Sequence, residues 1–97
     1  MSKYIFDIDN TICFTEGDDY ENAEPYLDRI EKVNKLYDEG HEIIYMTARG
    51  SETGINWEDL TKKQLKEWGC KYKSFGFKSY CDFFIDDKAF NSNEFFK

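Results

Sequence analysis

The sequence predicts an α/β fold built on a small parallel sheet flanked by helices. Short apolar runs typical of strands alternate with longer segments of helical period, in the order βαβαββ. Strands separated by helical segments favour crossover connections, and such connections produce parallel strands. Polar residues directly follow several of these runs, as expected where ligands bind at the carboxyl ends of parallel strands. With 97 residues, the chain fits one domain over residues 1–97 with a single core.

The first predicted strand is the apolar run Tyr4-Ile5-Phe6 near the start of the chain. Asp7 and Asp9 follow it at once. They share a face if the extended geometry continues, because alternate residues of a strand point the same way. Residues 11–24 contain Gly17 and an acidic cluster but no helical period, so we expect a loop or hairpin beside these carboxylates.

A helix is predicted over about residues 25–39. Pro25 suits its first turn, where a missing N–H costs little, and Gly40 provides a stop. Apolar residues recur between them at three- to four-residue spacing, which predicts one buried face. They are Leu27, Ile30, Val33 and Tyr37.

The second strand and the second helix come next. Residues 43–46 form a short apolar run of the buried-strand type, which ends at Thr47. Asn56, with Asp59 three residues later, resembles a helix cap, and we expect the helix to end before Gly69. Its predicted apolar face consists of Trp57, Leu60, Leu65 and Trp68.

Two short strands are predicted to complete the sheet, over residues 72–75 and 81–85. The second of these strands runs directly into the acidic pair Asp86 and Asp87. An aromatic tail follows, in which Phe95 and Phe96 could form a subunit contact.

Carboxylate pairs therefore follow both the first and the last predicted strand. Asp7 and Asp9 stand at one strand end, and Asp86 and Asp87 at the other. Oxygen ligands of this kind suit Mg²⁺, and a bound Mg²⁺ would reverse the sign of the local charge that a phosphate meets. The pattern predicts a divalent-metal site for phosphate chemistry.

The net charge and the cysteine content indicate which binding partners and which cellular compartment to expect. A formal net charge of −7 disfavours a nucleic-acid partner, because basic side chains supply most of that affinity. Cys13, Cys70 and Cys81 are odd in number and lack the paired spacing of zinc sites, so we expect reduced thiols in a cytoplasmic protein. No charged leader with a long apolar stretch and no run of membrane-spanning length is present, which predicts neither secretion nor membrane insertion.

Four segments together resemble a known enzyme superfamily. They are residues 7–11, with the sequence Asp-Ile-Asp-Asn-Thr, residues 43–47, ending at Thr47, the single residue Lys78, and residues 84–87, ending in Asp86 and Asp87. In this order and spacing they are similar to the four motifs of haloacid dehalogenase-like (HAD) phosphatases. The resemblance spans residues 4 to about 88 and implies a minimal HAD-like Rossmannoid fold.

The resemblance implies a phosphomonoesterase that forms a covalent intermediate. Asp7 would be the nucleophile that becomes an aspartyl-phosphate, and its free oxygen would hold Mg²⁺. Asp9 would protonate the leaving group and then deprotonate the attacking water, while its backbone carbonyl ligates the metal. Because Asp9 supplies the carboxyl that activates water, hydrolysis is favoured over storage of the phospho-enzyme.

The remaining motif residues would stabilise the phosphoryl group and the metal. Thr47 corresponds to the phosphate-binding hydroxyl, and Lys78 to the lysine that stabilises developing negative charge. Asp87 best matches the direct metal ligand, and Asp86 a residue that accepts from metal-bound water. Asn10 stands where many relatives have Gly, which it can replace because Asn tolerates a left-handed backbone, and we place it among the substrate-binding residues.

A narrower likeness concerns the substrate. Residues 47–50, 56–61, 64–65 and 85–89 are similar to small capless phosphatases of capsule or surface-polysaccharide synthesis, which implies a sugar phosphate. Arg49 could then reach a second anionic group or the sugar, or it could pair with one of the many acids. A similar T-x-R occurs in polynucleotide 3′-phosphatases, which keeps a nucleotidase or polynucleotide 3′-phosphatase as an alternative.

The intervals between the motifs leave no room for a cap domain. The site should therefore be open to solvent, unless a second subunit of a homo-oligomer covers it. An open site suits bulky substrates or a loose specificity, while the resemblance implies a small phosphorylated metabolite. A phosphate- or metal-binding module without turnover is the non-enzymatic alternative, although no motif residue is missing from the sequence.

Overall fold

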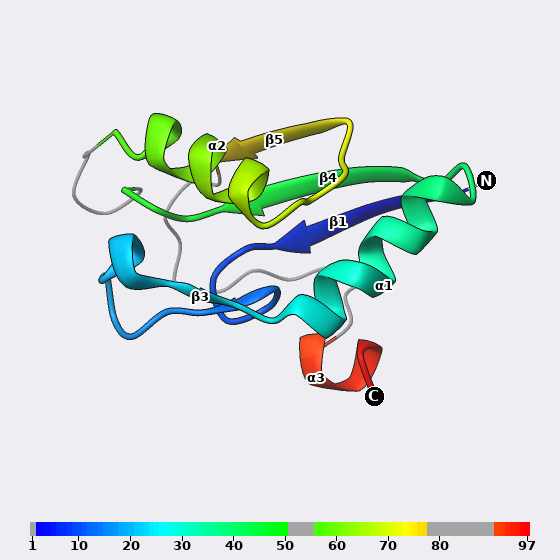
Figure 1. Cartoon of the computed structure of the whole chain (residues 1–97), viewed down its shortest axis with the longest axis horizontal. Coiled ribbons are helices and arrows are strands. Elements are labelled where there is room, and N and C mark those ends of the chain that lie inside the picture. Colours follow the sequence, from blue (N-terminus) through cyan, green and yellow to red (C-terminus); the bar gives the residue numbers. More distant parts are fainter. Residues whose placement is uncertain (1, 51–55, 78–90) are drawn as a thin grey trace.

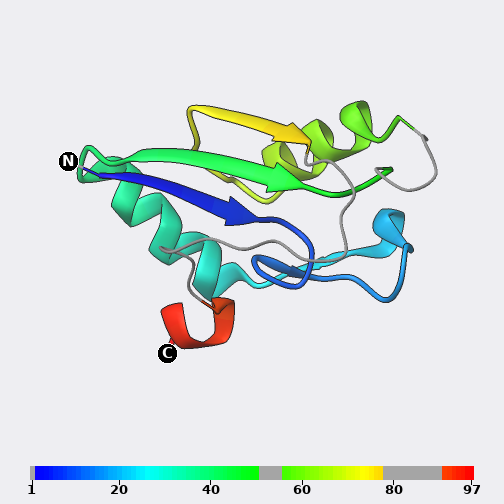
Figure 2. The ribbon, with the colours of Figure 1, turned by 180° about the vertical axis from the view of Figure 1, so that it is seen from behind.

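The computed structural model describes residues 2–50, 56–77 and 91–97, and shows an α/β fold with a parallel sheet. The sheet has the strand order β1-β4-β5, with β1 spanning Lys3–Asp7, β4 Glu42–Thr47 and β5 Ser74–Phe77. Both long helices lie on the same face of this sheet, as opposite views show (Figures 1 and 2). The predicted class, a small parallel sheet with helices, is confirmed.

Strands β1 and β4 pair in parallel over their full length, with Phe6 opposite Tyr45 and Asp7 opposite Met46. Side chains of β4 alternate between buried and half-buried, which places Tyr45 and Thr47 on the face that the helices cover. The predicted strands 4–6 and 43–46 are therefore confirmed, each extended by a residue at either end.

The segment after β1 forms a small hairpin. Strand β2 (Cys13–Phe14) pairs antiparallel with β3 (Glu24–Pro25), and the 3-10 turn η1 (Tyr20–Asn22) lies between them. The hairpin alternative for residues 11–24 is thus confirmed. The placement of Pro25 in a helix was wrong, because it ends β3, where the absent N–H of proline is tolerated.

Helix α1 spans Leu27–Asp38, close to the predicted range. Its buried residues are Ile30 and Val33, and Leu36 packs against the core. Leu27 is 64% exposed and Tyr37 is 41% exposed, so the predicted face was wrong at both ends. A face of Ile30, Val33 and Leu36 has helical spacing too, and only the position of the sheet decides between the two sets.

Helix α2 spans Glu58–Glu67 and ends, as predicted, before Gly69. The Asn56 side chain accepts a 2.9 Å hydrogen bond from the Glu58 backbone N–H, as a capping side chain does. The N-cap position itself is occupied by Trp57, one residue later than predicted. The buried face of α2 differs from the prediction, because two polar residues lie on it with Leu65. They are Thr61 and Gln64.

Strand β5 lies two residues later than predicted, at Ser74–Phe77 rather than at residues 72–75. Tyr72 is instead half-buried and packs edge-on against Tyr45, so it serves the core without belonging to the ladder. The predicted strand over residues 81–85 lies outside the described residues.

The core lies between the sheet and the two helices, and includes Ile43, Tyr45, Val33 and Leu65, each 0% exposed. The short helix α3 (Ser92–Phe95) closes one edge of the core. Its Phe95 packs edge-on against Phe6, with ring centroids 5.4 Å apart. The aromatic tail thus packs within its own chain, and a subunit contact through it stays a prediction. None of the described helices is long and apolar enough to span a membrane.

Candidate active site

The carboxyl edge of the sheet brings together residues from distant parts of the chain. Asp7 is the last residue of β1 and Thr47 the last of β4. The Ile8 backbone N–H donates a 3.1 Å hydrogen bond to the Met46 carbonyl, which continues the pairing of the two strands beyond Asp7. The chain after β1 therefore makes its turn directly beside Thr47.

A tight turn after β1 holds Asp9 in place. The carbonyl of Ile8 accepts hydrogen bonds from the backbone N–H groups of Thr11 and Ile12, at 3.2 and 3.0 Å. Asn10 has a φ of 61°, in the left-handed region, and its Oδ1 accepts a 3.1 Å hydrogen bond from the Thr15 N–H. Asn suits this position because it tolerates that conformation and its side chain closes the turn.

The Asp9 carboxylate receives donors from three residues, Thr15 after β2 and Thr47 and Arg49 at the end of β4. Arg49 contacts it with Nη2 at 2.8 Å from Oδ1 and with Nε at 3.0 Å from Oδ2. The Thr15 hydroxyl donates to Oδ1 at 2.7 Å, and the Thr47 hydroxyl to Oδ2 at 3.3 Å. The Asp9 side chain retains 20% exposure, so it is fixed but reachable from solvent.

Arg49 is itself held from behind by α2. Its side chain is 0% exposed. Its Nη1 donates to Gln64 Oε1 at 2.6 Å and to Thr61 Oγ1 at 3.1 Å. Its guanidinium carbon lies 4.9 Å from the ring centroid of Tyr20, whose carbonyl accepts a 2.6 Å hydrogen bond from Gln64 Nε2. Arg49 thus joins the β4 end, helix α2 and the η1 turn to Asp9.

Sequence reasoning did not assign roles to Thr15, Tyr20, Thr61 or Gln64. A signal for two of them was present, because Thr61 and Gln64 are polar residues at helical spacing next to the buried Leu65. Buried polar side chains need partners, and a buried guanidinium supplies several donors at once. Arg49 was predicted to contact substrate or to pair with an acid, and the structure pairs it with Asp9.

Thr47 is buried, with 1% exposure, at the floor of the site. Its hydroxyl oxygen accepts a 3.1 Å hydrogen bond from the Arg49 backbone N–H and donates its proton toward Asp9 Oδ2. To donate to a phosphoryl oxygen, the hydroxyl would have to rotate away from Asp9. The long 3.3 Å separation from Oδ2 makes that exchange inexpensive.

Only part of the predicted metal set falls within the described residues. Asp7 is exposed at the end of β1, and Asp9 follows it. Among residues 2–50, 56–77 and 91–97, no group of three or more His, Cys, Asp or Glu side chains is arranged to hold a metal ion. Lys78, Asp86 and Asp87 lie outside the described residues. The available donors, a carboxylate and a backbone carbonyl, are hard oxygen ligands that fit Mg²⁺.

Lys73 stands five residues before the predicted catalytic Lys78, but the structure places it away from the candidate site. Lys73 pairs with Glu42 at 3.1 Å, and its hydrogen bond holds the pKa of that half-buried carboxyl below its usual range. Glu42 begins β4, at the opposite end of the strand from Thr47. Lys73 therefore lies at the amino edge of the sheet, away from the candidate site.

A thiol lies directly beneath the Asp9 turn. Cys13 is 0% exposed, and its Sγ lies 3.4 Å from the Ile8 carbonyl and 3.8 Å from Asp9 Oδ1. Burial raises the pKa of the Cys13 thiol, so it stays protonated and can serve as a weak donor to these oxygens. Its contribution is packing and support for the turn.

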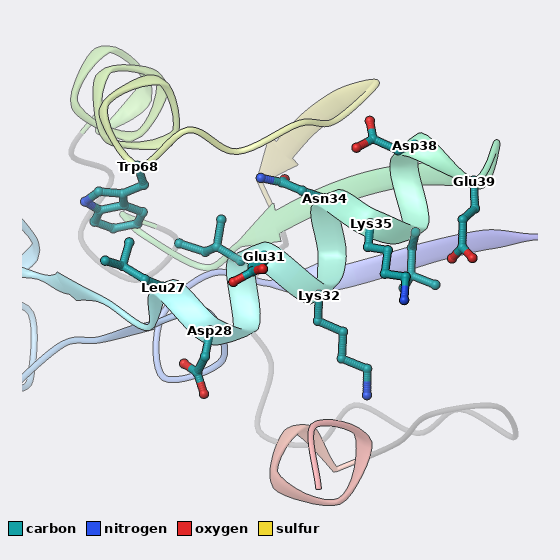
Figure 3. A pocket seen from close by; sticks show the side chains of 11 residues that line it. Leu27, Asp28, Glu31, Lys32, Asn34, Lys35, Asp38, Glu39 and Trp68 are labelled. Carbon is teal, nitrogen blue, oxygen red and sulfur yellow. The ribbon is translucent and has the colours of Figure 1, made fainter.

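A surface groove lies elsewhere, along the outer side of α1 toward Trp68 (Figure 3). Its walls mix acidic and basic side chains, such as Glu31 and Lys35. None of the candidate site residues lines it. Asn34 bridges it by donating to the Gly69 carbonyl at 2.9 Å, which ties the end of α2 to α1. The groove is formed almost entirely by α1, with Trp68 from the end of α2, and it contributes no residue to the site.

The fold and the site define a class: a minimal Rossmann-like α/β protein with polar residues gathered at the carboxyl edge of its sheet. The described residues contain only the β2–β3 hairpin and η1 between β1 and α1, and only α2 between β4 and β5, so they include no cap domain. Ligands of such sheets bind at this edge.

No family model and no curated protein matches the chain. Among solved structures, a structural-genomics target from Vibrio cholerae is similar with a TM-score of 0.87 and 30% sequence identity. The match covers 99% of this chain and 88% of the Vibrio chain. The chain therefore belongs to the same family as that Vibrio cholerae protein, whose description names no activity.

Proposed function

We propose that the protein is a Mg²⁺-dependent phosphomonoesterase of the capless HAD type. The observation that carries the proposal is the meeting of Asp7, Asp9 and Thr47 at one sheet edge, with the Thr47 hydroxyl 3.3 Å from Asp9 Oδ2. Two carboxylates beside a hydroxyl donor provide a nucleophile, a proton carrier and a phosphate contact. The resemblance of residues 4–88 to the four HAD motifs supports the same assignment.

In the first step, a carboxylate oxygen of Asp7 bonds to phosphorus while the bond from phosphorus to the leaving oxygen breaks. Asp9 gives its proton to that oxygen, so an alcohol departs and an aspartyl-phosphate remains. In the second step, water oxygen bonds to phosphorus and a water proton passes to Asp9. The bond from phosphorus to Asp7 breaks, which releases phosphate and restores both carboxyl groups.

The other predicted residues support this chemistry. Thr47 would donate to a phosphoryl oxygen, and Lys78 would stabilise the developing negative charge. Mg²⁺ would supply positive charge at the phosphoryl group when held by Asp7 and the Asp9 carbonyl, together with Asp87 and, through water, Asp86. Asn10 holds the turn beneath the substrate.

We propose a small phosphorylated metabolite as substrate, with a sugar phosphate favoured by the narrower sequence likeness. Among the described residues, only the short hairpin and η1 are inserted between β1 and α1, which supports a shallow, open entrance (Figure 1). The formal charge of −7 counts against a polynucleotide. Free thiols at Cys13 and Cys70 support a cytoplasmic location, where thiols stay reduced.

Phosphate release from a panel of substrates tests the proposal. The panel contains sugar phosphates, nucleotides and a 3′-phosphorylated oligonucleotide, each with Mg²⁺ or with EDTA. We expect metal-dependent release, loss of at least about 10³-fold in Asp7→Asn, and no change in the matched surface variant Asp18→Asn. Metal-independent release, or release that survives in Asp7→Asn, would overturn the mechanism. Phosphate binding without release would favour the binding-module alternative.

A further inference from the structure

We propose that Arg49 is a positioning residue for Asp9 and does not bind the substrate. Arg49 contacts both oxygens of the Asp9 carboxylate, and with Thr15 it fully occupies Oδ1, so that Oδ2 faces the reacting atoms and carries the proton. This inference rests on the proposed phosphatase function, because it assigns a task to Asp9 in that reaction. It also assigns different roles to the two carboxylate oxygens: Oδ1 fixes the orientation of the side chain, and Oδ2 transfers the proton.

The hydrogen bonds around Asp9 distinguish its two oxygens. Oδ1 accepts from Arg49 Nη2 at 2.8 Å and from the Thr15 hydroxyl at 2.7 Å, with Arg49 Nε a further contact at 3.2 Å. The two short contacts use both lone pairs of Oδ1. Oδ2 accepts from Arg49 Nε at 3.0 Å and, loosely, from the Thr47 hydroxyl at 3.3 Å. When Thr47 turns to a phosphate, Oδ2 keeps a lone pair for the proton.

The surroundings of Arg49 prevent it from reaching substrate. Its side chain is fully buried, and Nη1 is committed to Gln64 and Thr61 on α2. The Tyr20 ring lies against the guanidinium, with 4.9 Å between the guanidinium carbon and the ring centroid. A substrate could contact the guanidinium only after these contacts break. The planar fork is therefore fixed at one end by α2 and presents its other edge to Asp9.

This geometry demands arginine at position 49. A lysine has one nitrogen on a flexible stem and cannot bond α2 and both carboxylate oxygens at once. Asp9 would then rotate, and Oδ2 would no longer be held where the leaving oxygen departs. Loss of a well-placed general acid costs about 10²- to 10⁴-fold for leaving groups that need a proton. A weakly basic leaving group, such as p-nitrophenolate, departs without one.

The test compares kcat/KM for a sugar phosphate and for p-nitrophenyl phosphate in wild type and Arg49→Lys, since kcat/KM covers the steps through formation of the phospho-enzyme. We expect Arg49→Lys to lower kcat/KM by about 10²-fold for the sugar phosphate and by less than about tenfold for p-nitrophenyl phosphate. The matched control Arg29→Lys should leave the ratio of the two values unchanged, because Arg29 contacts Thr11 and Asn93 instead.

Gln64→Met provides a second variant in case Arg49→Lys does not fold, because it removes the Arg49 support while keeping a side chain of similar length. We expect the same selective loss, at about three- to tenfold. Equal losses for both substrates, or a rise in KM with kcat unchanged, would overturn the positioning role. Active wild type with inactive Asp7→Asn would then leave the phosphatase proposal standing, whereas inactive wild type on every substrate would overturn both.

Discussion

The hydroxyl of Thr15 donates a 2.7 Å hydrogen bond to Oδ1 of Asp9, across the turn that follows β1. The Thr15 backbone N–H meanwhile donates to the Asn10 side chain at 3.1 Å, so one residue secures both the turn and its carboxylate. Thr15 is 4% exposed, which removes water as a competing partner. The β2 strand end thereby shares with Arg49 the task of orienting Asp9.

Thr15→Val should weaken catalysis more than it weakens the fold. Valine matches the shape of threonine but lacks the donor, so Asp9 Oδ1 loses a short hydrogen bond. We expect kcat/KM for a sugar phosphate to fall about tenfold and the free energy of unfolding to fall by about 1 kcal/mol. Steady-state kinetics and urea unfolding measure the two effects. Thr15→Ser keeps the hydroxyl and should stay close to wild type, and unchanged kinetics in Thr15→Val would contradict the role.

Asn10 should tolerate glycine better than alanine. Its φ of 61° lies in the left-handed region, which costs a residue with an ordinary Cβ about 1–2 kcal/mol. Both substitutions lose the hydrogen bond to Thr15, but only alanine adds the backbone cost. Urea unfolding should therefore place Asn10→Ala about 1 kcal/mol below Asn10→Gly. Equal stabilities would show that the turn relaxes out of the left-handed conformation.

Tyr45→Phe should stabilise the fold or leave it unchanged. Tyr45 is 0% exposed, and its hydroxyl meets only the Cys70 thiol among the described residues, a weak partner that does not satisfy hydrogen-bond geometry. A buried hydroxyl without a strong partner costs about 1–3 kcal/mol, so its removal should raise the free energy of unfolding by about 1 kcal/mol. Thermal and urea unfolding check this, with Tyr37→Phe on the exposed side of α1 as control. A clear loss of stability would show that the contact with the Cys70 thiol outweighs the cost of burying the hydroxyl.

Alkaline pH should destabilise the protein through Cys70. Burial raises the pKa of the Cys70 thiol from 9.0 to about 12, so the folded chain keeps a proton that the unfolded chain loses. The folded state then binds more protons between these values, and stability falls as pH rises through that window by up to about 1.4 kcal/mol per pH unit. The burial of Tyr45 acts in the same direction.

The contribution of Cys70 can be isolated by comparison with Cys70→Ala. Urea unfolding of both proteins between pH ~8 and ~11 should show a shallower decline in the variant, because it has no thiol to titrate. The remaining decline comes from groups that both proteins share. Parallel curves would mean that Cys70 ionises as readily in the folded state as in the unfolded state.

Much of the fold could be predicted because its signals are local. The apolar runs at β1 and β4 and the glycine that follows each long helix appear in the sequence as such, and the structure confirms them. The predictions were wrong where the sequence pattern fits two alternative strand positions or two alternative helix faces about equally well. Tyr72 and Phe77 are both aromatic ends of a possible strand, and only the pairing with β4 places β5 at Ser74–Phe77. Leu27 likewise has helical spacing with Ile30, yet none of the described elements covers it.

Some features of the candidate site could likewise be predicted from the sequence, and others could not. The positions of Asp7 and Thr47 at two strand ends can be inferred from sequence, because hydrophobic periodicity and its interruption are properties of consecutive residues. The burial of Arg49, its support by Gln64 and its pairing with Asp9, forty residues away in the chain, depend on how distant segments pack together. The reason is physical: a buried guanidinium takes whichever acceptors the packing of α2 and the hairpin brings within reach, and local sequence carries no record of that packing.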